Sequence, residues 1–365
     1  MNRTHKFRQG MLLALAMFTA VLVFAAPQRC ADALHAGLVL CGGPLLVSLF
    51  PFLIVSALLM GCGAGPLLGF AFQPAARVIG VRAKAAGSVL LVGFLGGFAP
   101  AAAAAEQAVR TGQLTPRQAS ALLPACVCSG PSFVILTVGE QMLGSRALGM
   151  RLFAAQLLAG YLTAALFCRM QGGAGRCLPA KAEDNIPLPT LDAVVAQAAV
   201  TYLKLCGFVL YFRLLAAGAE ALLPKPWSVL PVMLLEVCSG CDCASRTGLW
   251  ASTLCCAALS VQGASVLLQV RTICPPEVSL GPLLAARVLH LPLSLALFWL
   301  VMPGTEQAVQ AFSTLSGRVV VMHRVPLDCA LLAFAVCCIT VAELQKRCSG
   351  QCEALHDQHK KTAAR

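Results

Sequence analysis

The sequence predicts an all-α, polytopic transmembrane protein that contains discontinuous helices, and three observations support this. Hydrophobic residues make up 58% of the chain, charged residues only 12%, and the mean hydropathy is +0.80. Such a composition lies far outside the range of water-soluble globular chains. Apolar runs recur along the whole chain, and some of them are interrupted by glycine, proline and serine.

Several of the apolar runs reach the roughly 20 residues that a helix needs to cross a hydrocarbon core of about 30 Å. The first run follows a basic head, as in a signal peptide. We interpret it as an uncleaved first helix, with cleavage near Ala26 as the alternative. The clearest runs cover residues 11–27, 38–60, 86–105, 119–139, 147–168, 194–219, 249–270, 283–302 and 326–343.

The net charge of +12 indicates orientation in a membrane rather than nucleic-acid binding. Basic residues gather before the first apolar run, after the second and behind the last. With all three groups on the cytoplasmic face, both termini are predicted to be cytoplasmic. The three groups are Arg3, Lys6 and Arg8; Arg77, Arg82 and Lys84; and Lys346, Arg347, Lys360, Lys361 and Arg365.

Two interrupted runs occur in each half of the chain. In the first half, residues 86–105 are broken at Gly96, Gly97 and Pro100. After a polar connector, residues 119–139 are broken at Ser129, Gly130, Pro131 and Ser132. In the second half, the run that ends at Glu236 turns polar at Ser239, Gly240 and Asp242. The next run is interrupted at Ser260, Gln262, Gly263 and Ser265.

Such interruptions at membrane depth predict a binding site. Irregular backbone cannot face lipid, so it must be buried in protein or line a watery cavity. Paired Gly/Pro-interrupted segments at matching places in two halves are the usual sequence sign of a transporter site. We therefore expect the polar side chains at the breaks to converge on one central solute site. These are Ser129 and Ser132, with the backbone of Gly130 and Pro131, and Glu236, Ser239, Asp242, Ser260, Gln262 and Ser265.

Several charged residues allow a structural interpretation beside the functional one. Glu236 either contacts solute inside the membrane or meets water at the interface. Asp242 has Arg246 four residues later as a partner. Lys204 and Arg213 are expected to snorkel to the surfaces. Arg287 and His290 share a helix face, where they either pack, help to orient the helix or reach into the cavity.

The 19 cysteines mostly lie in apolar runs, where cysteine acts as a small hydrophobe. A metal site formed by Cys126, Cys128, Cys238, Cys241 and Cys243 is the less favoured alternative, because structural zinc needs four converging ligands. The chain has no Walker loop, HExxH motif or nucleophile elbow. We therefore expect neither a cofactor nor an enzymatic activity.

A resemblance to a known family rests on the stretches SLFPFLIVSALL, GFLGGFAP, TGQLTPRQASALLPACVCSGPSFVILTVGEQMLGSRALG, MLLEVCSG, and ALSVQGASVLLQV followed by ARVLH. Over most of residues 40–300 the chain resembles the sporulation integral membrane protein family (YlbJ-like). Members of that family carry the nucleoside-recognition, or Gate, domain, which is similar to that of concentrative nucleoside carriers and the ferrous-iron transporter. The resemblance implies a multi-pass protein of the bacterial cytoplasmic membrane in a spore former, with two Gate-like repeats and a role in transport.

The sequence therefore predicts a carrier or channel for a small polar solute or ion, in contact with the lipid bilayer and not with nucleic acid. The alternatives are a non-transporting structural or assembly protein of the spore envelope and a cysteine-dependent metal transporter. A homo-oligomer is compatible with each, and the orientation of the repeats, inverted or parallel, is left open. The predicted divisions are an N-terminal helix and connector (1–37), two repeats (38–169 and 194–302) joined by a linker (170–193), a last loop and helix (303–345) and a basic tail (346–365).

Overall fold

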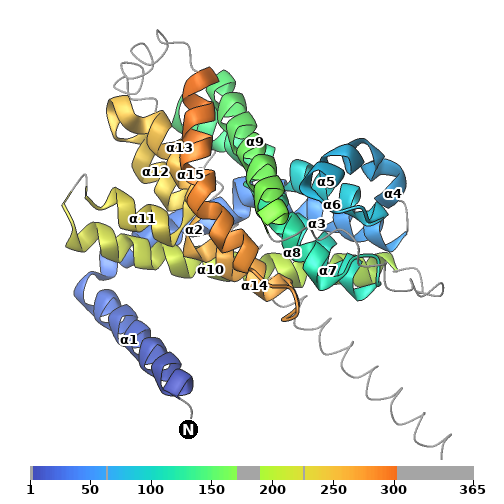
Figure 1. Cartoon of the computed structure of the whole chain (residues 1–365). Coiled ribbons are helices and arrows are strands. Elements are labelled where there is room, and N and C mark those ends of the chain that lie inside the picture. The colour runs from blue at the N-terminus through green and yellow to red at the C-terminus, as the bar shows by residue number, and fades with distance from the viewer. Residues whose placement is uncertain (1–2, 63–64, 171–189, 225–226, 302–365) are drawn as a thin grey trace, which may run out of the picture.

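A computed structural model of the chain describes residues 3–62, 65–170, 190–224 and 227–301 (Figure 1). Every regular element in these residues is a helix, which confirms the predicted all-α class. The predicted last helix, the basic tail and most of the linker 170–193 lie outside the described residues.

The N-terminal helices bend sharply where prolines and glycines stand. The bend between α1 and α2 is 107° and falls just before Pro27, which opens α2. A second irregularity lies in η1, where Gly43 has φ −115° and ψ −105° and precedes Pro44. In chain order the elements are α1 Arg3–Ala25, α2 Pro27–Leu40, η1 Cys41–Leu45 and α3 Leu46–Gly61.

The rest of the first half consists of short helices followed by one long one. Gly144, with φ 72°, and Ser145, whose Oγ accepts from the Leu148 N–H at 3.2 Å, fix the start of that long helix. Thr115 and Gln118 form a reciprocal capping box after the polar connector. The elements are α4 Gly65–Leu68, η2 Gly69–Phe72, α5 Gln73–Ile79, α6 Lys84–Gly96, α7 Phe98–Arg110, α8 Pro116–Cys126, η3 Ser132–Met142 and α9 Arg146–Met170.

The second half has interrupted helices between two long ones, α10 and α15. Its elements are α10 Leu191–Leu222, α11 Val229–Leu235, α12 Val237–Ser245, η4 Gly248–Trp250, α13 Ala251–Val261, α14 Gly263–Ile273 and α15 Gly281–Val301. The two halves interleave, since α15 packs on α8 and α9, α14 on α7, and α12 on η3. Figure 1 shows α9 and α15 side by side in the middle of the molecule.

By helix length and hydropathy the chain is a multi-pass membrane protein. Four described helical stretches are long and apolar enough to cross a membrane: Arg146–Met170, Leu191–Leu222, Gly248–Ile273 and Gly281–Val301. The number rises to six if the bent pairs Gln9–Ala25 with Pro27–Leu45 and Gly69–Ile79 with Lys84–Gly96 each count as one span.

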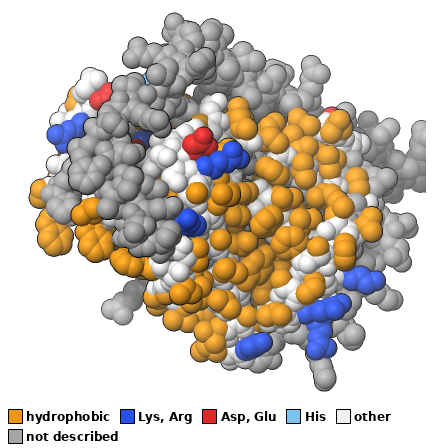
Figure 2. Space-filling model, turned by 90° about the horizontal axis from the view of Figure 1, so that it is seen from above, with side chains coloured by type: hydrophobic (Ala, Val, Ile, Leu, Met, Phe, Trp, Pro, Cys, Tyr) orange, Lys and Arg blue, Asp and Glu red, His pale blue; other side chains and the backbone are white. Residues whose placement is uncertain are grey.

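Much of the surface is apolar, as contact with lipid requires. Figure 2 shows a face covered largely by hydrophobic side chains, with Lys and Arg gathered at its margin. Large apolar side chains are also exposed along the long helices, among them Leu158, Leu162 and Leu166 on α9 and Val288 and Leu300 on α15. A water-soluble protein rarely exposes so much contiguous apolar surface.

Candidate functional site: four helix breaks

The first two helix breaks touch each other through their main chains. Gly97, with φ 81° and ψ −161°, separates α6 from α7. Residues 127–130 separate α8 from η3. A Cβ added to Gly97 would lie only 2.5 Å from the main-chain nitrogen of Gly130. Here only glycine permits both the backbone angles and the close approach.

The third and fourth breaks form an equivalent pair in the second half. Glu236, in an extended conformation with φ −151°, separates α11 from α12. Gln262, with φ 61°, separates α13 from α14. A Cβ added to Gly263 would lie 2.8 Å from the carbonyl carbon of Leu235 and 2.9 Å from the Glu236 nitrogen. In both halves, then, two interrupted helices meet at their interruptions.

Some of the predicted break positions need correction. Gly240 does not break a helix: it lies inside α12, and the interruption falls four residues earlier, at Glu236. Gly96 is the last residue of α6, and Pro100 is the third residue of α7, a first-turn position where a missing N–H costs little. Gly97 and Gly263 stand at breaks, as predicted.

Glu236 is a buried helix cap. Its side chain is 1% exposed, so it does not meet water at an interface as the structural interpretation required. Oε1 accepts from the Cys238 N–H at 2.8 Å, and Oε2 accepts from the N–H and the hydroxyl of Ser239 at 2.6 and 2.8 Å. Through these three hydrogen bonds the carboxylate caps the N-terminus of α12, where a helix leaves N–H groups without partners.

Arg287, on α15, joins the breaks of the two halves. Its guanidinium donates to the main-chain carbonyl of Val127 at the second break. At the fourth break it donates to the carbonyl of Ser260 at 3.3 Å and to Oε1 of Gln262 at 2.8 Å. The carbonyls freed at a helix C-terminus attract cations. In this molecule that cation is an arginine side chain.

A buried polar cluster connects α9, α13 and α15 next to Arg287. Gln156 Nε2 donates to Ser260 Oγ at 2.8 Å and to the Cys256 carbonyl at 3.0 Å. Ser260 Oγ also contacts Ser294 Oγ, and His290 Nε2 bonds to the Gln156 carbonyl at 3.1 Å. Gln156 and Ser294 are not among the residues that the sequence predicts for the site. A glutamine within the apolar run LFAAQLLAG is nevertheless a sequence signal of a buried polar contact.

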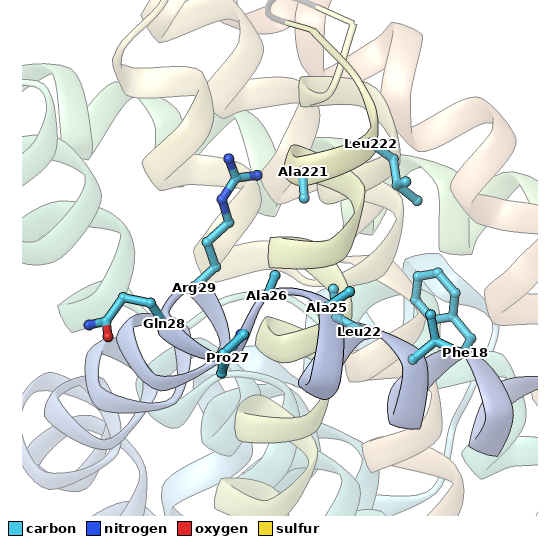
Figure 3. A pocket seen from close by; sticks show the side chains of 10 residues that line it. Phe18, Leu22, Ala25, Ala26, Pro27, Gln28, Arg29, Ala221 and Leu222 are labelled. Atoms are coloured by element: carbon cyan, nitrogen blue, oxygen red, sulfur yellow. The ribbon is translucent and has the colours of Figure 1, made fainter.

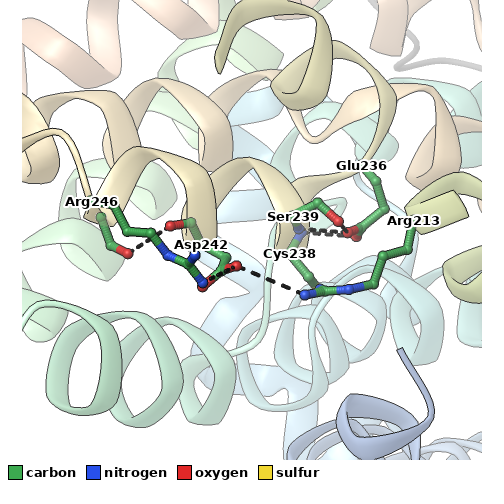
Figure 4. A network of polar contacts seen from close by, with 7 residues as sticks. Arg213, Glu236, Cys238, Ser239, Asp242 and Arg246 are labelled. Atoms are coloured by element: carbon green, nitrogen blue, oxygen red, sulfur yellow. Dashed lines mark hydrogen bonds and ion pairs between the residues drawn. The ribbon is translucent and has the colours of Figure 1, made fainter. Parts of the chain in front are cut away.

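A second network, drawn in Figure 4, lies along α12 and includes two arginines. Arg246 binds both carboxylate oxygens of Asp242 at 2.9 and 2.8 Å, which confirms the predicted pair. Arg213 of α10 approaches the same carboxylate at 3.8 Å. Its side chain is only 14% exposed, so the expectation that Arg213 snorkels is wrong. Lys204, by contrast, is exposed.

The predicted polar residues therefore fall into several connected groups rather than one cluster. Glu236 with Ser239, and Ser260 with Gln262, lie at the second pair of breaks. Ser129 is buried in the second break, whereas Ser132 is half-buried at the start of η3. Ser265 accepts from Gln269 within α14 at 2.9 Å, and Asp242 belongs to the more exposed arginine network.

Neither the cysteines of the described residues nor the surface pocket adds a second site. Among the described residues, no group of three or more His, Cys, Asp or Glu side chains could hold a metal ion. A pocket between α1, α2 and the end of α10 contains none of the break residues (Figure 3). It is lined mainly by apolar side chains such as Phe18 and Leu22, with Gln28 and Arg29 as its longer polar members.

Comparison of the chain with protein-family models, with curated proteins and with solved structures found no match. The class that the fold itself defines is a multi-pass, all-helical membrane protein with interrupted helices.

Proposed function

We propose that the protein is a carrier or channel for a small polar solute and that the four helix breaks form its binding site. The observation that carries this proposal is the meeting of the breaks. Gly97 contacts Gly130, Gly263 contacts Glu236, and Arg287 connects the two pairs. Non-helical backbone at membrane depth is tolerated only inside protein or along a cavity, and paired interruptions are typical of transporters.

The pieces of helix beside the breaks have the length that this function needs. They range from 7 residues in α11 to 13 residues in α6 and α7. At 1.5 Å per residue, the longer pieces extend about 20 Å, which is more than half of a hydrocarbon core of about 30 Å. The breaks are thus suited to lie near the middle of the membrane, where solute sites of such carriers are found.

The test is ligand binding and flux with the purified full chain. Thermal unfolding in detergent would be measured against uridine, adenine, dipicolinate, amino acids and divalent cations, and uptake of each compound would be followed in proteoliposomes. A ligand at one hundred times its Kd should stabilise the protein by about 2.7 kcal/mol. The expected result is stabilisation and uptake by one compound class.

Ser129→Ala and Ser279→Ala form a matched pair for this test. Ser129 is buried in the second break, whereas Ser279 is exposed before α15. Loss of binding in Ser129→Ala but not in Ser279→Ala would place the ligand at the breaks. If no compound stabilises the protein and none is taken up, the transport proposal fails.

The second candidate is a non-transporting structural membrane protein, and the state of Glu236 favours it. All three hydrogen bonds to this carboxylate come from its own helix, and its side chain is 1% exposed. A carboxylate that is buried and hydrogen-bonded in this way is accounted for by capping alone, as a scaffold requires. Gate-like repeats, a bacterial cytoplasmic membrane and an association with sporulation stay predictions from the resemblance for either function.

A further inference from the structure

The positive charge of Arg287 has no acidic partner within the part of the chain that the structure describes. The three groups that accept from it are the carbonyls of Val127 and Ser260 and the side-chain oxygen of Gln262. All three are neutral dipoles. Ionised arginine inside a membrane span is expensive and is stabilised by an opposite charge or by backbone carbonyls. Here only neutral groups accept from it, so the site keeps a net positive charge.

Arg213 provides an internal comparison. It also lies on an apolar helix within a candidate span, and its side chain is only 14% exposed. Arg213 reaches the carboxylate of Asp242, as does Arg246. The described part of the chain therefore pairs a mostly buried arginine with an aspartate in α12, yet places no acid beside the arginine at the breaks.

Two N–H donors beside this charge are buried and have no acceptor among the described residues. They are Nε of Arg287 and Nε2 of Gln262. The two side chains are held together by the 2.8 Å bond from Arg287 to Gln262 Oε1, and Gln262 is fully buried. A buried donor without an acceptor costs about 1 to 3 kcal/mol. Both free donors therefore favour a ligand that brings acceptor oxygens.

We propose that Arg287 and Gln262 form an anion-recognition site and that the solute carries a small oxyanion, such as a carboxylate or a phosphate. The proposal rests on the proposed function, since it names the substrate class of the same site. A carboxylate supplies both the missing negative charge and two acceptors, and arginine matches this planar geometry well. A neutral solute would leave the net positive charge of the site in place.

Binding of matched anionic and neutral probes to the full chain in detergent tests this inference. The probes are succinate against succinamide, benzoate against benzamide, and inorganic phosphate, at constant ionic strength. Each carboxylate or phosphate should raise the unfolding temperature, whereas the amides, which keep the shape without the charge, should leave it unchanged. Equal shifts with acid and amide, or no shift with any anion, would overturn the proposal.

Gln262→Glu and Arg287→Lys identify the site. Gln262→Glu keeps the acceptor for Arg287, replaces the free donor by an oxygen and supplies a resident negative charge. We expect this variant to unfold at a higher temperature without ligand and to bind the anions at least tenfold more weakly. Arg287→Lys keeps the positive charge but loses the planar guanidinium, which can donate two parallel hydrogen bonds to one oxyanion. Anion affinity should therefore fall while the fold persists. Wild-type affinity in Gln262→Glu contradicts the assignment.

Flux measurements separate this inference from the proposed function. If a neutral compound is taken up into proteoliposomes and no anion binds, the transport proposal stands and the oxyanion site is rejected. Anion binding that Gln262→Glu abolishes, without flux of any probe, would retain the site and reject transport.

Discussion

Gly97 and Gly130 touch through their main chains, so that a single added Cβ at Gly97 would lie 2.5 Å from the Gly130 nitrogen. Gly97 also has φ 81° and ψ −161°, a region of backbone angles that other residues essentially never adopt. The two interrupted helices of the first half can therefore approach this closely only because Gly97 has no side chain.

Gly97→Ala should destabilise the protein severely. Backbone strain and the clash together should cost about 2 to 5 kcal/mol. Gly207→Ala is the matched control, because Gly207 is an exposed residue inside α10 with nothing within 4 Å of an added Cβ. Alanine there should be neutral or stabilise by up to about 1 kcal/mol. The two variants are compared by their unfolding temperatures and by the monodisperse fraction after purification. If Gly97→Ala is as stable as Gly207→Ala, the close contact between Gly97 and Gly130 is contradicted.

Glu236→Gln should destabilise the protein by about 2 kcal/mol, because the amide NH2 would face a donor where the carboxylate oxygen now accepts. It should also weaken the interaction with the N-terminus of α12. Thermal unfolding in detergent measures the effect. Glu140→Gln, at an exposed position in η3, is the control and should change stability little. If both variants unfold at the wild-type temperature, Glu236 does not cap α12 as described.

Asp242→Asn should destabilise the protein more than Arg246→Gln does. Asp242 is the anion for both Arg213 and Arg246, and its loss removes the ion-pair partner of Arg213, whose side chain is only 14% exposed. Because the Asp242 side chain is 34% exposed, solvent screening limits the expected loss to about 1 kcal/mol. Arg246 is 66% exposed, so Arg246→Gln should fall within about 0.5 kcal/mol of the wild type. The reverse order in thermal unfolding would count against the bridge to α10.

Both termini are predicted to be cytoplasmic from the distribution of basic residues. Reporter proteins that are active on only one side of the membrane, fused in turn to the N-terminus and to the C-terminus, measure this directly. Fusions at both ends should be active only as cytoplasmic reporters. Opposite locations of the two ends would reverse the predicted number of crossings from even to odd.

The sequence predicted those features of the fold that depend on local chemistry. The all-α class follows from apolar runs of bilayer length, and the interruptions near Gly97 and Gly263 follow from glycines, which disfavour helix. The Asp242–Arg246 pair follows from a spacing of four on one helix. The break at Glu236 differs from the predicted position at Gly240. Glycine is the residue that usually interrupts a helix, but here Gly240 lies inside α12 and the Glu236 carboxylate caps the start of that helix.

The contacts that join the breaks could not be predicted, because they depend on how distant helices pack. Arg287 reaches Val127, 160 residues earlier in the chain, and Gln156 reaches Ser260, 104 residues later. Neither spacing has a sequence signature. Arg213 shows the same limit: seen alone, an arginine in an apolar run is expected to snorkel, and only the position of α12 gives it Asp242 as a partner.

The packing of α2 has a consequence for the order of synthesis. Beyond its immediate neighbours in the chain, α2 packs mainly against α10 (Figure 1). A Cβ added to Gly37 would lie 2.8 Å from the Leu210 side chain. On the order of 150 residues separate the two helices, so at about 5 to 20 residues per second the ribosome needs roughly eight to thirty seconds to reach α10. During that interval α2 lacks its final neighbour. The nascent chain must therefore rely on the insertion machinery or surrounding lipid to shelter its N-terminal helices until α10 emerges.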